Sequence, residues 1–103
     1  MPDTPLTIDV IDDVFVVAGE IDAHTCGWLD EALGDDPKGD VCRVDLRAVT
    51  FMDSSGLRVL VRHHQRCAKA DVRFEIVQPS RPVQRLFEIS GLTGQLRIVA
   101  LES

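Results

Sequence analysis

The segment VCRVDLRAVTFMDSSGL, residues 41–57, decides the fold, because a strand pattern changes to a helix pattern within it. Val41–Leu46 is an apolar, partly alternating run that predicts a strand, and apolar residues recur at helical spacing from Leu57. The sequence Asp-Ser-Ser-Gly at residues 53–56 joins the two patterns. Small polar residues at the start of a helix leave backbone N–H groups that favour negative charge. The junction therefore predicts a functional loop that would tolerate a phosphate on Ser54.

The rest of the chain continues this alternation of strands and helices. Asp12-Asp13 separates two apolar-rich runs and predicts the turn of an antiparallel hairpin. The other expected strands are Leu6–Ile11, Val14–Ala18, Val72–Val77 and Leu96–Leu101. The expected helices are Ala23–Leu33 with Asp22 as N-cap, Leu57–Ala70, and a helix that opens at Ser80 and ends at Gly91. The order predicts a single α/β domain over residues 1–103, with a mixed, mainly parallel sheet of about five strands, opened by the hairpin, and three main helices packed on it.

Composition indicates a small globular domain. The 103 residues are 45% hydrophobic and 27% charged, and no apolar run approaches the roughly 18 residues that cross a bilayer. The net charge of −6 is unevenly placed, because residues 1–40 carry eleven acidic side chains and one lysine, whereas residues 41–103 carry ten basic and six acidic ones. An acidic chain without interleaved aromatic and basic residues lacks the usual nucleic-acid footprint. The first five residues lack the features of a signal peptide, so we expect a cytoplasmic protein that binds neither membrane nor nucleic acid.

The cysteine and histidine residues show no recognisable metal or disulfide pattern. Cys26, Cys42 and Cys67 are odd in number and lack C-x-x-C spacing, so reduced thiols are expected. Cys42 lies in an apolar strand and is interpreted as a core residue, while a redox role for Cys26 or Cys67 stays open. His63 and His64 are adjacent on a helix and point in different directions, with His64 expected to pack and His63 to face solvent. No metal and no cofactor are expected.

Several kinds of chemistry compete for residues 53–56. A nucleophilic Ser54 would need the layout of a hydrolase elbow, but Met52 stands where that elbow has a glycine, and no histidine pattern completes a triad. A phosphoaspartate receiver would use Asp53, but neither lysine of the chain follows a strand end as that chemistry requires. Glycine loops that bind phosphate are absent from the sequence. Helix capping by Asp53 or Ser54 is the plain structural alternative. We therefore expect that the chain is not an enzyme.

A basic stripe of Arg58, Arg62, Arg66 and Lys69 lines one face of the helix expected after this junction. Most charged helical faces are simply solvated. The functional alternative is a docking face. Because the stripe begins one turn after Ser54, a protein that covers the serine would also cover Arg58 and Arg62.

Residues 44–57 resemble the signature of STAS domains, in particular the bacterial anti-sigma factor antagonists. Two other segments agree in their order along the chain. Residues 19–22, GEID, are similar to the family's loop after its second strand, and residues 87–92, FEISGL, are similar to the end of its last helix. The resemblance covers nearly the whole chain, and it implies that Ser54 is the residue phosphorylated by a partner kinase.

The resemblance implies a non-enzymatic switch protein. In its unmodified form such a protein binds an anti-sigma factor that is also a serine kinase, and so releases a sigma factor for transcription. Phosphorylation of Ser54 abolishes this binding, and a metal-dependent serine phosphatase restores it. The expected partner-binding residues are Asp22, Asp53, Ser55, Gly56, Arg58 and Arg62. The alternative is a STAS-type ligand-sensing or scaffolding module in a signalling complex.

Overall fold

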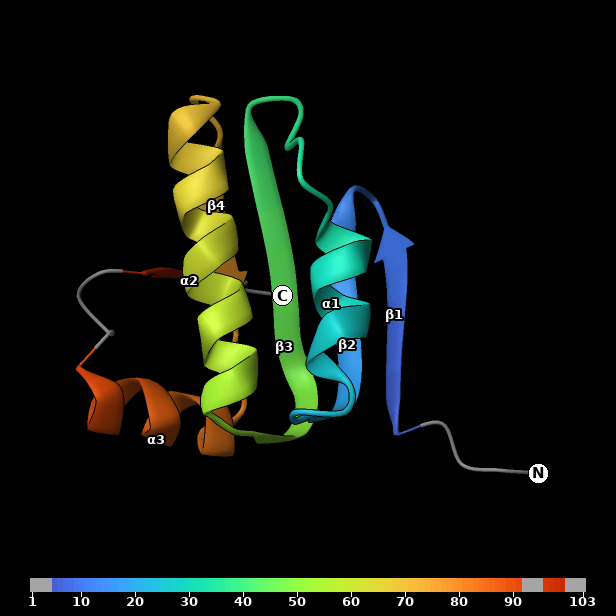
Figure 1. Cartoon of the computed structure of the whole chain (residues 1–103), viewed down its shortest axis with the longest axis vertical. Coiled ribbons are helices and arrows are strands. Elements are labelled where there is room, and N and C mark those ends of the chain that lie inside the picture. The colour runs from blue at the N-terminus through green and yellow to red at the C-terminus, as the bar shows by residue number, and fades with distance from the viewer. Residues whose placement is uncertain (1–4, 92–95, 100–103) are drawn as a thin grey trace.

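The computed structural model describes residues 5–91 and 96–99, in which strands and helices alternate as expected (Figure 1). The strands are β1 (Leu6–Ile11), β2 (Val14–Ile21), β3 (Val41–Met52), β4 (Arg73–Val77) and β5 (Arg97–Val99). The helices are α1 (Cys26–Leu33), α2 (Ser54–Lys69) and α3 (Arg81–Ser90). Every predicted element is present with its predicted type.

The strands form one sheet whose spatial order, β1-β2-β3-β4-β5, is also their order in the chain. β1 and β2 are antiparallel, and the turn between them, Asp12 and Asp13, has positive φ angles of 51° and 65°. Such angles match the twist of a two-residue hairpin. The pairs β2–β3, β3–β4 and β4–β5 are parallel, and a helix connects the strands of each pair. The predicted mixed, mainly parallel sheet is confirmed.

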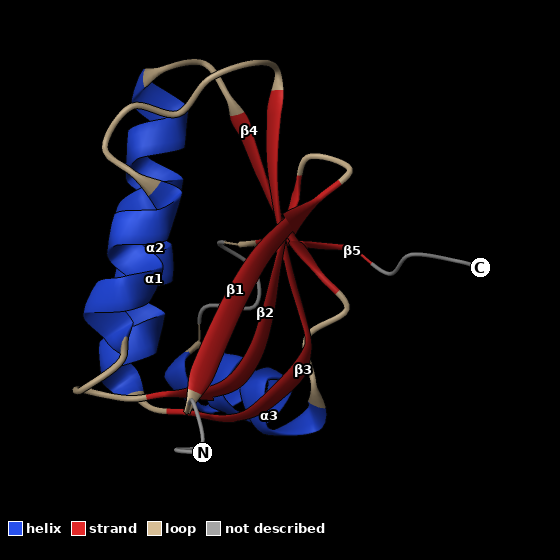
Figure 2. Cartoon of the chain, turned by 90° about the vertical axis from the view of Figure 1, so that its right-hand side faces the viewer, coloured by secondary structure: helices blue, strands red, loops and turns tan. Residues whose placement is uncertain are grey.

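The helices cover the sheet in two places. α1 and α2 lie side by side against one face, whereas α3 lies near the lower end of the sheet and packs against β3 (Figure 2). The core between these layers is apolar, and Leu29, Val44, Leu60, Ile76 and Phe87 are all at most 1% exposed. Burial of each such side chain stabilises the fold by about 1.5–3 kcal/mol. None of the helices in the described residues is long and apolar enough to span a membrane.

Two strands extend further than the sequence pattern predicts. β2 continues to Ile21 and β3 to Met52, beyond the expected ends at Ala18 and Leu46. Their parallel pairing shifts register twice along the way. A shift in register interrupts the regular alternation of buried and exposed residues. The alternation of apolar residues in the sequence therefore does not show where the strand ends. The longer strands bring the loops that follow them to one edge of the sheet.

The starts of the first two helices also differ from prediction. α1 begins at Cys26 instead of Ala23, because the residues before it form a turn. α2 begins at Ser54 instead of Leu57, so the Asp-Ser-Ser-Gly sequence forms the cap and first turn of the helix rather than a loop before it.

The last elements agree with prediction within the described residues. α3 follows Ser80, has a proline in its first turn and ends at Gly91, whose φ of 75° is the expected left-handed cap. β4 begins one residue later than expected, at Arg73. β5 occupies Arg97–Val99 of the expected strand Leu96–Leu101, of which residues 100 and 101 lie outside the described part.

The buried face of α2 is rotated from the predicted one. His63 is fully buried, so its predicted place on the surface is wrong, whereas His64 is half-buried and packs against Phe74 as expected, with 6.3 Å between the ring centroids. The His63 ring packs edge-on against Phe74, with 5.3 Å between the ring centroids. Burial lowers the pKa of His63, which favours the neutral imidazole. The sequence pattern placed His64 rather than His63 on the packed face, because it did not fix how α2 is rotated against the sheet.

Candidate functional site

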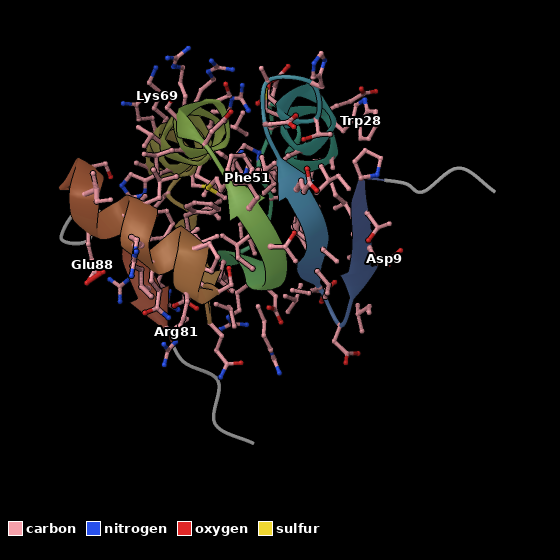
Figure 3. All side chains as sticks on the ribbon, turned by 90° about the horizontal axis from the view of Figure 1, so that it is seen from below. Asp9, Trp28, Phe51, Lys69, Arg81 and Glu88 are labelled. Atoms are coloured by element: carbon pink, nitrogen blue, oxygen red, sulfur yellow. The ribbon has the colours of Figure 1, made fainter. Side chains whose placement is uncertain are left out.

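The candidate site lies at the edge of the sheet where β2 and β3 end side by side. Ile21 and Met52, the last residues of the two strands, are paired, and the backbone N–H of Asp53 donates to the Ile21 carbonyl oxygen at 3.1 Å. The loops that start at Asp22 and Asp53 are therefore neighbours. Figure 3 shows the molecule from this end, with Phe51 near the tip of β3. Functional loops commonly gather at the carboxyl edge of an open α/β sheet.

Asp53 and Ser54 form the start of α2. Asp53 is the N-cap, and its carboxylate accepts a hydrogen bond from the backbone N–H of Ser55 at 2.8 Å. Ser54 is the first helical residue and is exposed, whereas Ser55 is half-buried. A negative group on the Ser54 hydroxyl would lie at the positive end of the helix dipole. Helix capping explains why an aspartate stands at position 53, and the exposed Ser54 follows it directly in the chain.

Asp22 stabilises the turn before α1 and is not the N-cap predicted for that helix. Its Oδ1 accepts hydrogen bonds from the backbone N–H groups of His24 at 2.9 Å and Thr25 at 3.1 Å. The hydrogen bond from His24, together with that from Thr25, holds the pKa of Asp22 below its ordinary value of 3.8. The Thr25 hydroxyl donates to the Glu20 carbonyl oxygen at 2.8 Å and accepts from the Asp22 N–H at 2.9 Å. The Asp22 carboxylate is thus held in place in the turn that follows β2.

Gly56 lies beneath the site rather than on its surface. It is buried, and a Cβ at this position would stand 2.5 Å from Ile21 Cγ2 and 2.9 Å from Met52 Cγ. The missing side chain lets the first turn of α2 approach the ends of β2 and β3 closely. A direct contact of Gly56 with a partner protein stays a prediction, and burial favours a packing role for this residue.

The predicted basic stripe is divided between two roles. Arg58 is exposed in the second turn of α2. Arg62 and Arg66 form ion pairs with Asp30 of α1, at 3.4 and 3.0 Å, and Arg66 also donates to the Gly34 carbonyl oxygen at 3.2 Å. Arg66 therefore joins α1 to α2, while Arg58 and the half-exposed Arg62 face solvent on the side of the helix that begins at the site.

Two exposed aromatic residues were not singled out by the sequence analysis. Phe51 of β3 is 47% exposed, and Trp28 of α1 is 49% exposed (Figure 3). Exposed aromatic side chains next to polar loops are typical of protein–protein contacts. The sequence offered a hint, because Trp28 is the only tryptophan of the chain and Phe51 lies two residues before Asp53.

The arrangement is suited to recognition and modification at an exposed hydroxyl. Among the described residues, Cys42, His63 and Cys67 form a group of possible metal ligands. Cys42 lies at the other end of β3, about 30 Å along the strand from Met52 at roughly 3.3 Å per residue. These cysteines and His63 are therefore not part of the candidate site. That site consists of Ser54, the carboxylates of Asp22 and Asp53, which accept hydrogen bonds from backbone N–H groups, and the side chains around them.

Comparisons with known proteins identify the family. The sequence model of the STAS domain matches residues 6–101. The chain is 39% identical over 92 residues to the anti-sigma-B factor antagonist of Listeria monocytogenes, and this alignment covers 87% of this chain and 80% of that protein. It is 32% identical over 105 residues to the anti-sigma-F factor antagonist RsfB of Mycobacterium tuberculosis, which covers 94% and 83% of the two chains.

Solved structures agree with this assignment. The crystal structure of an anti-sigma factor antagonist from Mycobacterium paratuberculosis is similar with a TM-score of 0.71 and 29% sequence identity, covering 90% of this chain and 82% of that chain. The anti-sigma factor antagonist SpoIIAA in its unphosphorylated form shares the fold, with a TM-score of 0.72 and 20% identity over 95% of this chain and 89% of that chain. Because the family match spans nearly the whole sequence, this chain belongs to the STAS domain family.

Proposed function

We propose that this protein is an anti-sigma factor antagonist, which binds an anti-sigma factor and so frees a sigma factor for transcription. The names of the relatives from Listeria monocytogenes and Mycobacterium tuberculosis support this role, since their alignments cover 87% and 94% of this chain. The single observation that carries the proposal is the exposed Ser54 at the start of α2, beside the Asp22 turn and the exposed Phe51.

Phosphorylation of Ser54 turns the binding off. A phosphate adds nearly two negative charges at neutral pH. Asp22 and Asp53 lie in the loops that follow β2 and β3 at the same edge of the sheet as Ser54, and both carboxylates accept hydrogen bonds from the backbone, Asp22 from His24 and Thr25 and Asp53 from Ser55. A protein that covers this surface would have to remove the phosphate from water next to these charges, which costs free energy. Binding is therefore lost through a local block.

The anti-sigma factor itself is the serine kinase, and a serine phosphatase removes the phosphate. The protein acts in the cytoplasm as the substrate of both enzymes and is not itself an enzyme. The contact surface comprises Asp22, Phe51, Asp53, Ser55, Arg58 and Arg62, with Gly56 supporting it from beneath. Phe51 supplies the apolar centre of this surface, because aromatic anchors dominate the binding energy of many interfaces.

Intact-mass spectrometry tests the switch. The purified protein is incubated with ATP, Mg²⁺ and each candidate anti-sigma kinase from the organism that encodes it. Ser54→Ala removes the proposed acceptor, and Ser55→Ala is the matched control, because it removes the neighbouring hydroxyl in the same helical turn. We expect a mass gain of one phosphate in the wild type and in Ser55→Ala, and no gain in Ser54→Ala.

Calorimetric titration with the same candidate kinases separates binding from modification. A phosphate that persists in Ser54→Ala contradicts the proposed site. Tight binding without any phosphate transfer supports the antagonist role and contradicts the switch. If no candidate binds or modifies the protein, the antagonist proposal fails. A small molecule retained through purification would then favour the ligand-sensing alternative.

A further inference from the structure

Three possible metal ligands meet inside the domain, away from the candidate site. The Sγ atoms of Cys42 and Cys67 and a ring nitrogen of His63 all lie within 4.8 Å of one another. Cys42 belongs to β3, whereas His63 and Cys67 lie one turn apart on α2, so the cluster joins the sheet to the helix. Cys42 is 8% exposed and the other two residues are fully buried. Sequence spacing did not show this cluster, because it depends on how α2 packs against β3.

One distance in the cluster matches the separation expected between two ligands of one ion. Bond lengths of about 2.3 Å to sulfur and 2.0–2.1 Å to nitrogen, at tetrahedral angles, place the two donor atoms about 3.6 Å apart. The distance between Cys42 Sγ and His63 Nε2 is 3.6 Å. The second thiol, that of Cys67, is also within hydrogen-bonding reach of Cys42, so both sulfur atoms and the imidazole meet at one point.

Core packing also does not provide a hydrogen-bond partner for every polar atom of the His63 imidazole. Among the described residues, His63 Nδ1 is buried without a hydrogen-bond partner. A buried polar atom of this kind costs stability, and its presence in a folded protein calls for an explanation. An apolar side chain would fill the same space next to Phe74 without this cost, so apolar packing does not explain why a histidine stands here. The ring nitrogen that faces Cys42 Sγ is Nε2, and this is the atom that would bind an ion.

A groove gives access to the cluster. It has a volume of about 660 Å³, and both Cys42 and His63 contribute to its lining. The charged residues around it are Asp12, Asp13, Asp36, Lys38, Asp40 and Arg43. Arg43 is paired with Glu75 at 2.9 Å, which leaves the acidic side chains in excess. A groove lined mainly by one sign of charge raises the local concentration of oppositely charged ions.

We propose that Cys42, His63 and Cys67 bind one thiophilic metal ion, Zn²⁺ or Cu⁺. Two thiolates and one imidazole are ligands that select such soft cations over Mg²⁺ or Ca²⁺. Three ligands suffice for trigonal Cu⁺, and a water molecule from the groove completes the tetrahedral coordination of Zn²⁺. The bound ion clamps β3 to α2 in the half of the domain opposite Ser54.

Binding releases two protons, one from each thiol, because only the thiolates are ligands. Burial raises the pKa of Cys42 to about 12 and also raises that of Cys67. The metal-free protein therefore keeps both groups as neutral thiols in its core. Metal affinity rises with pH, because protons compete with the ion for the sulfur atoms.

Competition titrations on the reduced, metal-free chain test this site. One arm titrates Zn²⁺ against a colorimetric chelator, and the other titrates Cu⁺ anaerobically against a Cu⁺-specific chelator. Cys42→Ala and Cys67→Ala each remove one ligand, and Cys26→Ala is the matched control, since Cys26 is half-buried and outside the cluster. We expect one ion per chain. Affinity should fall by more than about 100-fold in both ligand variants, because even outer-shell partners contribute ~10–100-fold, and should be unchanged in Cys26→Ala.

Circular dichroism shows whether the ligand variants fold. If they do not, the Co²⁺ absorption spectrum of the wild type decides, because a thiolate-to-cobalt charge-transfer band requires cysteine ligands. The band supports the proposal, and its absence, together with no Cu⁺ bound in the anaerobic titration, overturns it. The proposal also fails if neither Zn²⁺ nor Cu⁺ binds, if folded ligand variants keep the wild-type affinity, or if oxidation forms a Cys42–Cys67 disulfide in a protein that binds neither ion.

Discussion

Among single residues, Gly56 makes the closest approach at the candidate site. Replacing it with alanine would put a Cβ 2.5 Å from Ile21 Cγ2, so the helix or the strand end would have to shift. We expect Gly56→Ala to lower the free energy of unfolding by about 1–3 kcal/mol, as overpacking of a tight contact does. Gly27→Ala in α1 is the control with the opposite sign, because nothing lies within 4 Å of that position. It should stabilise by up to about 1 kcal/mol through helix propensity.

Urea unfolding of the two variants and the wild type, followed by far-UV circular dichroism, measures both effects. A Gly56→Ala protein as stable as the wild type would show that the first turn of α2 adapts easily. In that case the glycine would be needed at the surface instead, and the packing role assigned to it would be wrong.

The carboxylate of Asp22 provides a test based on pH. Its pKa is lower in the folded chain than in the unfolded chain, mainly because of the hydrogen bond from the His24 N–H. The folded state therefore holds fewer protons, and the contribution of Asp22 to stability is complete above the unfolded value of about 3.8. It is lost as the pH falls through the lower folded value.

An NMR titration of the His24 and Thr25 amides measures this pKa directly. Their chemical shifts should report a midpoint below 3.8, and Asp22→Asn should abolish that transition while the amide oxygen still accepts both hydrogen bonds. A midpoint at or above the ordinary aspartate value would show that the turn is not held by the carboxylate in solution.

Residue identity alone supports some of these assignments and not others. The strand-to-helix junction pointed to residues 53–56, but capping is a common use of polar residues there, and the phosphorylation of Ser54 stays a prediction that came from the family resemblance. The sequence could not identify Gly56 as a packing residue or His63 as a buried one. Both facts depend on which face of α2 meets the sheet. The pattern of apolar residues left the rotation of the helix about its axis uncertain by about one residue.

At the scale of elements, a charged contact joins α1 to α2. Asp30 accepts from both Arg62 and Arg66, and the Arg66 side chain is only 20% exposed. We expect Asp30→Ala to destabilise the protein by about 1 kcal/mol, the upper end of the range for pairs that are partly exposed. Arg58→Ala, an exposed arginine on the same helix, should change stability by less than about 0.5 kcal/mol.

Urea unfolding at low and high salt distinguishes this contact from simple packing. The destabilisation by Asp30→Ala should shrink at about 1 M salt, where the screening length is roughly 3 Å. A loss of stability that is independent of salt would indicate that Asp30 acts through helix packing, and it would remove the reason for assigning Arg66 to the fold.

The type and order of the elements were predictable from sequence, while their ends were less so. Hairpin turn residues, helix caps and apolar periodicity all favour the same arrangement from β1 to α3. Short-range sequence signals were therefore enough to predict the type and order of these elements. The ends of β2 and β3 were missed because they depend on pairing between the two strands, which shifts register near the site. The missed strand residues include Phe51, which belongs to the proposed contact surface, and Ser54 is the first residue of α2 rather than part of a loop before it.

In the molecule as a whole, the uneven charge of the sequence becomes a spatial division. The acidic residues 1–40 include β1, β2 and α1, which lie together at one side of the sheet, and the elements β3 to β5, from the more basic residues 41–103, form the rest of the described structure (Figure 1). The Ser54 site lies where the two parts meet, at the ends of β2 and β3. A partner with complementary charge would be oriented as it approaches, and its association rate would fall as the ionic strength rises.

The same view of the whole molecule predicts how a negative charge on Ser54 acts. The residue is exposed and is the first of α2, so an aspartate there faces the positive end of the helix dipole. Ser54→Asp should therefore leave the melting temperature unchanged or raise it by a few degrees, as expected for up to about 1 kcal/mol in a domain of this size. Its affinity for the anti-sigma factor should fall by about tenfold or more, because desolvating an unpaired carboxylate costs on the order of several kcal/mol.

Gln65→Glu is the matched control, since it adds one negative charge at an exposed position further along the same helix. Calorimetric titration and thermal unfolding of both variants separate two mechanisms. If Ser54→Asp loses affinity and keeps its melting curve while Gln65→Glu changes neither, the switch is a local block at the surface. If lost affinity comes with a large drop in melting temperature, the charge acts by disturbing the packing of α2 on β2 and β3. The proposed phosphorylation would then act by rearranging the fold instead of blocking the surface.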